Sequence, residues 1–189
     1  MKTSVGPRTL LYPAPALIVG TYDKVGNPNG MAAAWTGICC SKPPCAAVSL
    51  RKATYTYGNI VDRKAFTLNI PSDEQMAQVD YLGMASGRDE DKLAAARLTP
   101  VRGEHVDAPY VEECPVVLEC RLVHTFELGL HTQFIGEIVD VKADEAVLGK
   151  DGIPDMAKVR PLVFAPESRS YYRLGEYLGR AFSIGKTLR

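Results

Sequence analysis

Arg51, Lys52 and Thr54 are the residues best placed for chemistry, because they come directly after a short apolar segment. Residues 46–50 predict a buried strand, and the prolines before them end a loop. Thr54 is the residue type that caps a helix N-terminus, and we expect a helix over residues 55–61. The free N–H groups and the dipole of such a helix start favour a bound anion, and two cations stand beside it. The pattern leaves two interpretations open: a phosphate-binding site, or a capped helix beside two solvated cations.

Composition and charge limit the class of protein. The chain has 189 residues with 22 acidic and 22 basic side chains, so no net charge draws it to nucleic acid or to an anionic membrane. It has no apolar run of the roughly eighteen residues that a membrane span needs, and Pro7, Pro13 and Pro15 interrupt the segment where a signal peptide needs an apolar helix. We therefore expect one cytoplasmic domain over residues 1–189, with a glycine-rich C-terminal arm over about residues 173–189.

The five cysteines predict free thiols and no metal centre. They stand at positions 39, 40, 45, 114 and 120, a spacing that fits neither a zinc site nor a CxxC redox pair. Neighbours such as Cys39 and Cys40 rarely bridge, because the geometry is strained, and free thiols agree with a reducing cytoplasm. These two thiols either line a site or are small buried apolar residues. The second interpretation is favoured because free cysteine is so often buried.

Alternating apolar and polar residues predict a chain that is mainly β. The expected strands cover residues 16–22, 30–36, 46–50, 65–70, 116–127, 131–142, 161–165 and 170–172. Gly129 lies between the two longest of them, which predicts an antiparallel hairpin. Helices are expected from Pro71 onward and, after a Ser-x-x-Asp capping box at residues 86–89, as far as Leu98. Few helices and many antiparallel strands favour a closed β-barrel with attached helices.

Several segments follow one another in a distinctive order: NGMAAAWTGICCSKPPCAAVSLRKATYTYGNI, KAFTLNIP, SGRDEDKL and GLHTQFIGEI. Each is a loose motif, but their order and spacing together resemble the flavin reductase-like FMN-binding split-barrel family, and within it most of all the flavoredoxins. The resemblance covers the chain from about residue 11 to the tail. It implies a six-stranded Greek-key split β-barrel, a homodimer, and one non-covalently bound FMN per subunit near the dimer interface.

The same resemblance implies which residues hold FMN. They are Ala34, Trp35 and Thr36 along the isoalloxazine ring, Ser49, Leu50 and Arg51 at the ring edge and phosphate, Thr54 and Tyr55 closing the phosphate pocket, and Ser86, Gly87 and Lys92 as a second phosphate-side group. The Thr54 and Tyr55 placement agrees with the anion site at the expected helix start. The positive charge of Lys92 would attract a phosphate. The acidic residues 89–91 beside it would repel a phosphate and interact favourably only with the N-terminus of their own helix.

His131 is the catalytic candidate. It stands in GLHTQFIGEI, which matches a family segment whose histidine lies by the flavin face that receives nicotinamide. Leu130 stands where many relatives carry Asp, which removes a carboxylate partner of the imidazole. The residues by themselves also fit a turn histidine that donates to a backbone carbonyl.

The function implied by the resemblance is that of an FMN-binding flavoprotein with redox activity. Either NAD(P)H reduces the bound flavin, or the protein carries electrons between other redox proteins. No GxGxxG fingerprint is present, and a split barrel needs none, so motifs do not separate these two versions. The alternative is a non-catalytic flavin- or haem-binding split-barrel module, which has no use for a histidine open to the ring face.

Overall fold

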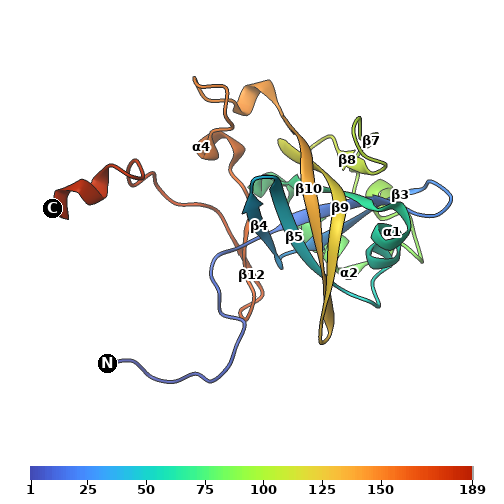
Figure 1. The fold of residues 1–189 in the computed structure, drawn as a ribbon, viewed down its shortest axis with the longest axis horizontal. Coiled ribbons are helices and arrows are strands. Elements are labelled where there is room, and N and C mark those ends of the chain that lie inside the picture. Colours follow the sequence, from blue (N-terminus) through green and yellow to red (C-terminus); the bar gives the residue numbers. More distant parts are fainter. Residues whose placement is uncertain (189) are drawn as a thin grey trace.

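A seven-stranded antiparallel sheet forms the body of the protein in the computed structural model, which describes residues 1–188 (Figure 1). The strand order is β3-β2-β6-β9-β10-β5-β4. The bounds are β2 (Leu17–Tyr22), β3 (Pro28–Ala33), β4 (Thr36–Ser41), β5 (Pro44–Arg51), β6 (Ala65–Ile70), β9 (Val116–Leu128) and β10 (His131–Ala143). The mainly β class with attached helices is confirmed. The expected closed barrel is wrong for the described residues, because the edge strands β3 and β4 are not paired with each other.

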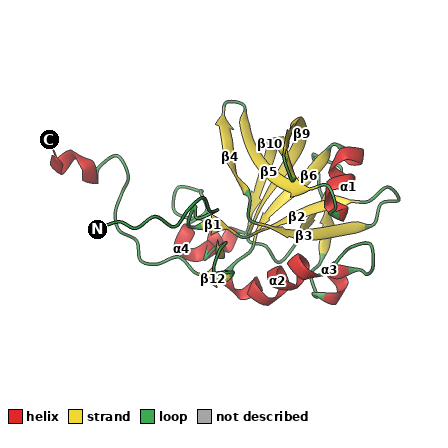
Figure 2. Ribbon diagram, turned by 90° about the horizontal axis from the view of Figure 1, so that it is seen from below, coloured by secondary structure: helices red, strands yellow, loops and turns green. Residues whose placement is uncertain are grey.

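Shorter elements surround this sheet, as Figure 2 shows. The small strands are β1 (Ala14–Pro15), β11 (Val163–Ala165) and β12 (Ser170–Tyr172) in one sheet, and β7 (Pro100–Arg102) with β8 (Pro109–Val111) in another. The helices are α1 (Tyr55–Arg63), η1 (Asp73–Gln75), α2 (Met76–Met84), α3 (Lys92–Ala95), η2 (Glu145–Val147), α4 (Met156–Val159) and η3 (Ile184–Leu188). None of the helices described in residues 1–188 has the length and apolar character to cross a membrane.

The chain crosses between the two edges of the main sheet at Ala34 and Trp35. The single strand expected over residues 30–36 is wrong: β3 ends at Ala33 and β4 begins at Thr36. These two strands are neighbours in sequence but lie at opposite edges of the sheet. The alternating pattern could not reveal this corner, because the apolar residues 31–35 run through it without a turn-forming residue. The extra edge strand β4 explains why the sheet has seven strands where six were expected.

Side chains on the two faces of β2 pack into two different hydrophobic clusters. Val19 points into the sheet's interior cluster with Phe66 and Phe134, all of them fully buried. Its neighbour Ile18 points the other way, into a cluster with Leu82 of α2. This follows from the two-residue period of a strand, since successive side chains face opposite sides. The apolar run over residues 16–22 is therefore buried on both faces, because β2 lies between these two apolar clusters.

The long hairpin is confirmed, and one helix start is corrected. β9 pairs with β10 across the turn at Gly129, whose φ of 53° lies in the left-handed region that glycine tolerates. The capping box expected at residues 86–89 is wrong, because the Ser86 hydroxyl accepts the N–H of Arg88 within a turn. Asp91 caps α3 instead, accepting the Ala94 N–H at 3.0 Å, and the helix has only four residues.

Cys39 and Cys40 are exposed on the edge strand β4, so the interpretation that they are buried is wrong. β4 pairs with β5 only, and its residues 37–41 are all exposed. Cys45, Cys114 and Cys120 are buried, as free cysteines usually are. Within residues 1–188 no cluster of three or more potential ligands is placed to hold a metal ion.

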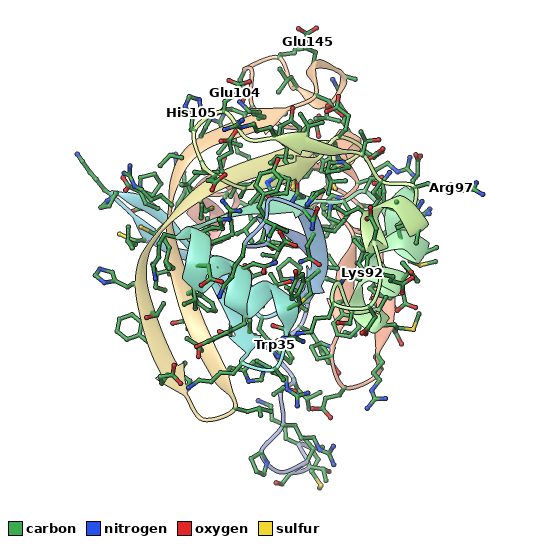
Figure 3. All side chains as sticks on the ribbon, turned by 90° about the vertical axis from the view of Figure 1, so that its right-hand side faces the viewer. Trp35, Lys92, Arg97, Glu104, His105 and Glu145 are labelled. Atoms are coloured by element: carbon green, nitrogen blue, oxygen red, sulfur yellow. The ribbon has the colours of Figure 1, made fainter. Side chains whose placement is uncertain are left out.

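A buried carboxylate fixes the loop between β7 and β8. Glu119 of β9 is fully buried, and its two oxygens accept the backbone N–H groups of Glu104 at 3.2 Å and His105 at 2.7 Å. Lys142 Nζ lies 3.4 Å from the same carboxylate and 2.9 Å from Asp140. Figure 3 shows Glu104 and His105 in the upper part of the view and Trp35 below the centre. The charge of Glu119 therefore serves the fold at a distance from Trp35.

Replacing Glu119 with glutamine is expected to lower the free energy of unfolding by about 1–3 kcal/mol, because an amide NH₂ would face a buried backbone N–H that needs an acceptor. Urea unfolding would measure the change. Glu137→Gln is the matched control, since Glu137 pairs with the exposed Arg121 and such pairs contribute about 0–1 kcal/mol. Equal losses in the two variants would contradict a special role for Glu119.

Candidate functional site

The expected convergence of a strand end with a helix start is confirmed. The Thr54 hydroxyl accepts the Tyr57 N–H at 3.3 Å and donates to the Arg51 carbonyl at 2.9 Å. The Thr54 N–H also donates to that carbonyl, at 3.0 Å. The chain thus turns tightly from β5 into α1, and Arg51 stands beside the first turn of the helix. The amides at a helix start have no acceptor within the helix, so this turn offers donors to an anion.

A buried polar network fixes the position of α1 on the sheet. Asn29 Nδ2 of β3 donates to the Thr56 hydroxyl at 2.9 Å, and Asn59 Nδ2 of α1 donates to the Thr21 hydroxyl at 3.1 Å. All four side chains are buried. Directional bonds of this kind hold the helix start in one orientation, which a purely apolar contact would not do. Asn29 Oδ1 is buried and accepts no hydrogen bond from the described residues.

The structure distinguishes between the two cations at the end of β5. Lys52 forms an ion pair with Glu127, with 2.6 Å between Nζ and the carboxylate oxygen. The Arg51 guanidinium is exposed and has no ion-pair partner in the part of the chain that the structure describes. Arg51 is therefore the cation that is free to meet an anion at the start of α1.

The loop before α3 packs against the start of α1 through Arg88, a residue that the sequence analysis did not select. Arg88 Nη1 donates to the Ala53 carbonyl at 2.9 Å, and its guanidinium lies 5.5 Å from the centre of the Tyr55 ring. A Cβ on Gly87 would come within 2.2 Å of Asn29 Oδ1 and 2.9 Å of Tyr55, so only glycine allows this approach. The structure thus brings Gly87 against Tyr55 and Asn29. Arg88 was recognisable as the cation within the SGRDEDKL segment.

Tyr55 is held from two sides. Its hydroxyl donates to Asp23 at 3.0 Å, and Arg88 covers its ring. Burial, together with this hydrogen bond and the charge of Asp23, raises the pKa of Tyr55 above its ordinary value. Asp23 also anchors the far end of α1, because its carbonyl accepts the Arg63 guanidinium at 2.9 Å. Tyr55 is therefore a fixed wall of the site.

Lys92 is buried, with 4% of its surface exposed. Its ammonium donates to the Leu82 carbonyl at 3.1 Å, near the C-terminal end of α2. Burial lowers the pKa of Lys92 to about 8, although the charge of Glu90 opposes the drop. No carboxylate forms an ion pair with Lys92 within residues 1–188. A buried ammonium normally has a counter-ion, and Lys92 has none within the described residues.

The corner at Ala34 and Trp35 lies against β5. The Trp35 carbonyl accepts the Ser49 N–H at 2.9 Å, and Thr36 faces Val48 across the strands. Trp35 is 39% exposed, which is unusual for a side chain of this size. From Ser49 to Arg51 the strand advances about 7 Å, so the Trp35 corner and the free cation lie along one strand of the sheet.

An apolar cavity of about 400 Å³ opens beside this corner. Strands β2, β4, β5, β6 and β9 line it together with α4 and the residues before β11. Thr36 supplies the only polar side chain of the lining. Its Oγ1 is buried and has no hydrogen-bond partner among the described residues. The corner therefore combines apolar surface, an accessible indole and an unused hydroxyl.

His131 opens β10 directly opposite Arg51. The two residues are paired across the strands, as are Thr132 with Leu50 and Gln133 with Ser49. His131 is half-buried and follows the exposed Leu130. The sheet thus places the catalytic candidate beside the cation and the helix start, although the two lie far apart in the sequence.

Comparison with known proteins decides the family. The family model described as "Flavin reductase like domain" matches residues 9–174. The chain belongs to the flavin reductase-like family. Flavoredoxin of Desulfovibrio vulgaris (Miyazaki F) is 60% identical with a TM-score of 0.94, and the match covers 98% of this chain and 100% of that one. Flavoredoxin from Methanosarcina acetivorans is 32% identical with a TM-score of 0.93 over the full length of both chains.

A third flavin reductase-like structure is described as an FMN-binding domain. It comes from Shewanella baltica, is 26% identical with a TM-score of 0.75, and the match covers 88% of this chain and 89% of that chain. The features of this flavin reductase-like protein fit a ligand with a ring and a phosphate. Arg51 and Lys92 are cations without ion-pair partners within residues 1–188, and the helix start supplies N–H donors. Thr36 Oγ1 offers an unused polar atom at the apolar corner.

Proposed function

We propose that this protein is an FMN-dependent redox protein, in which NAD(P)H or another redox protein reduces the bound flavin. The cofactor is FMN. When bound, it supplies the electron and hydride chemistry, while the protein binds, orients and shields it. The observation that carries the proposal is the free Arg51 guanidinium beside the capped start of α1, with His131 facing it across the strands.

Each part of the site has a separate task in this proposal. Arg51, the first turn of α1 and Lys92 hold the phosphate. The corner from Ala34 to Thr36 and the backbone of Ser49 and Leu50 lie along the ring, and Thr36 also borders the apolar cavity. Thr54, Tyr55, Ser86 and Gly87 keep the helix start and the neighbouring loop in place. His131 positions the nicotinamide of the donor on the open side of the ring.

The test of this function is spectroscopic. The purified protein is expected to be yellow and to release FMN, identified by chromatography, after acid or heat treatment. Anaerobic titration with NADH, with NADPH and with a reduced redox protein then shows which donor bleaches the flavin absorbance. FAD alone, or no flavin after reconstitution, would contradict the proposal. Retention of FMN that no donor reduces would favour the alternative, a non-catalytic flavin- or haem-binding module.

His131→Ala is expected to slow the reduction of bound flavin by NAD(P)H while FMN affinity stays nearly unchanged. The reason is that a side chain on the open face acts on the donor's approach and apparent affinity, not on the flavin itself. Stopped-flow reduction and flavin titration measure the two effects separately. Leu130→Ala is a suitable control, because Leu130 is the exposed neighbour in the turn. Loss of FMN from the His131 variant would show that the histidine supports the pocket.

The C-terminal arm supports a proposed homodimer. Arg173 anchors the root of the arm through an ion pair with Asp73 at 2.9 Å, and the chain then leaves the body of the protein (Figure 1). Tyr177, Leu178 and Phe182 are 82%, 89% and 99% exposed. Large apolar side chains gain free energy when they are covered, and a second copy of the chain is the commonest partner of a soluble protein. Residue 189 of the expected arm lies outside the described residues.

Deleting the residues after Tyr177 is therefore expected to shift a dimer toward monomer or to loosen FMN. Sedimentation velocity at micromolar concentration measures the first effect and flavin retention the second. A double replacement of Leu178 and Phe182 by serine is a second test, because it removes apolar surface while keeping the length of the arm. A full-length chain that is monomeric with full flavin occupancy would overturn the proposed dimer.

A further inference from the structure

Three of the five cysteines lie together near the tip of the β4–β5 hairpin. Ser41 faces Pro44 across the two strands, and the next facing pair is Cys40 with Cys45. Cys39 falls at the register irregularity between Ile38 and Cys40 and has no facing residue on β5. Its Sγ lies 3.5 Å from the Cys45 carbonyl oxygen and is oriented to the backbone. Figure 2 shows this hairpin at the edge of the sheet.

The facing pair has the geometry of a disulfide. Residues that face each other on antiparallel strands have Cα atoms about 4.5–5.5 Å apart, and their side chains point to the same side of the sheet. Disulfides form between Cα atoms about 4.4–6.8 Å apart. Cys40 and Cys45 therefore face each other at a separation that a disulfide can span, whereas the adjacent Cys39 and Cys40 would need a strained peptide.

The two thiols of the pair differ in accessibility. Cys40 is exposed, while Cys45 is 5% exposed. A soluble disulfide oxidant therefore reaches Cys40 first and forms a mixed disulfide with it. Cys45 is the neighbouring thiol that then attacks the Cys40 sulfur. Burial raises the pKa of Cys45, with the charges of Cys40, Cys39 and Glu137 adding to the effect. Its thiolate becomes more abundant as pH rises, so the resolving step is expected to be faster at alkaline pH.

We propose that Cys40 and Cys45 form a reversible cross-strand disulfide by exchange with a low-molecular-weight disulfide such as oxidised glutathione. The Cys40 thiolate attacks one sulfur of the oxidant, which gives a mixed disulfide and releases one glutathione thiolate. The Cys45 thiolate then attacks the Cys40 sulfur and releases the second. Two protein thiols are oxidised, one glutathione disulfide is reduced to two glutathione thiols, and both protein protons go to solvent or to the leaving thiolates. The disulfide covalently links β4 to β5 next to the turn of this hairpin.

Differential alkylation tests the pairing on the flavin-loaded protein. The protein is incubated with oxidised glutathione, free thiols are blocked with a light reagent, and reduced disulfides are then labelled with a heavy reagent. We expect the heavy label on Cys40 and Cys45, and the light label on Cys39, Cys114 and Cys120. Before reduction, denatured protein should show three free thiols where the untreated chain has five, because one bond consumes two. The oxidised monomer should be lighter by two hydrogen atoms.

Serine variants separate this pairing from its competitors. Cys39→Ser is expected to form the bond as the parent does. Cys40→Ser is expected to prevent it, and Cys45→Ser is expected to stop at the mixed disulfide, with glutathione retained on Cys40. Flavin absorbance measured in parallel shows that each variant is folded. The heavy label on Cys39 or Cys120, a lasting glutathione adduct on Cys40 in the parent, or a disulfide-linked dimer on a non-reducing gel would each overturn the proposal.

Discussion

Arg51→Ala is expected to weaken the binding of FMN roughly 10- to 150-fold and to leave the binding of riboflavin nearly unchanged. Only FMN carries the phosphate dianion, and a charge-assisted hydrogen bond contributes about 1.5–3 kcal/mol. The guanidinium is free to make this bond, since it has no ion-pair partner within residues 1–188. Fluorescence titration of the apoprotein with the two flavins, at one salt concentration, measures the ratio directly.

Lys52→Ala is the matched control for this prediction. Lys52 is the next residue along the chain and carries the same charge, but it is paired with Glu127 at 2.6 Å. If net charge alone mattered, the two variants would weaken FMN equally. If Arg51 contacts the phosphate, only the Arg51 variant loses the preference for FMN over riboflavin. An equal loss for both flavins in the Arg51 variant would mean that Arg51 touches the ring or supports the fold.

Lys92 is expected to make FMN binding take up a proton at alkaline pH. Burial lowers the pKa of Lys92 from 10.5 to about 8 in the flavin-free protein, so between these values the ammonium is increasingly deprotonated. A bound phosphate dianion favours the charged form and raises the pKa again. Calorimetry of FMN binding in buffers of different ionisation enthalpy measures the uptake. Lys92→Met should abolish it and, below pH 8, weaken FMN roughly 10- to 150-fold.

The same lysine gives a stability test with a definite sign. The unfolded chain keeps its proton up to the ordinary pKa of 10.5, whereas the folded apoprotein loses it near 8. The unfolded state therefore binds more protons in this interval, and the apoprotein becomes more stable as pH rises through it, by on the order of 3 kcal/mol. FMN should flatten this rise, and Lys92→Met should remove it. A rise that FMN does not change would place the phosphate away from Lys92.

Local sequence patterns determined much of the fold because they reflect short-range physics. A threonine before an amphipathic segment is an N-cap wherever it stands, and Thr54 caps α1 as expected. Alternation around Gly129 produced the long hairpin of β9 and β10, and Ser72 opens the next helical segment with a capping box. The turn from β5 into the capped start of α1, where we propose that the phosphate binds, was visible from the same local reasoning. The order of the motifs along the chain was by itself enough to indicate the family.

Other predictions failed where the outcome depends on distant segments. At Ala34 and Trp35 the chain crosses from one edge of the sheet to the other, and Cys40 lies exposed on the edge strand β4. The residues next to these positions do not determine where their strands lie in the sheet. Residues 86–89 do not cap a helix, because Arg88 and Gly87 pack this loop against the start of α1. Asp91 is the N-cap of α3 instead.

The sequence by itself determined the residue types of the site, the strand and helix that carry them, and the family to which the chain belongs. Only the tertiary structure decided which cation is free, since Lys52 finds Glu127 on another strand and Arg51 finds no partner within residues 1–188. It also buried Lys92 and set His131 opposite Arg51. The physical reason is that caps and periodicity act over a few residues, whereas burial, ion pairing and strand register depend on chain segments that meet only in the folded protein.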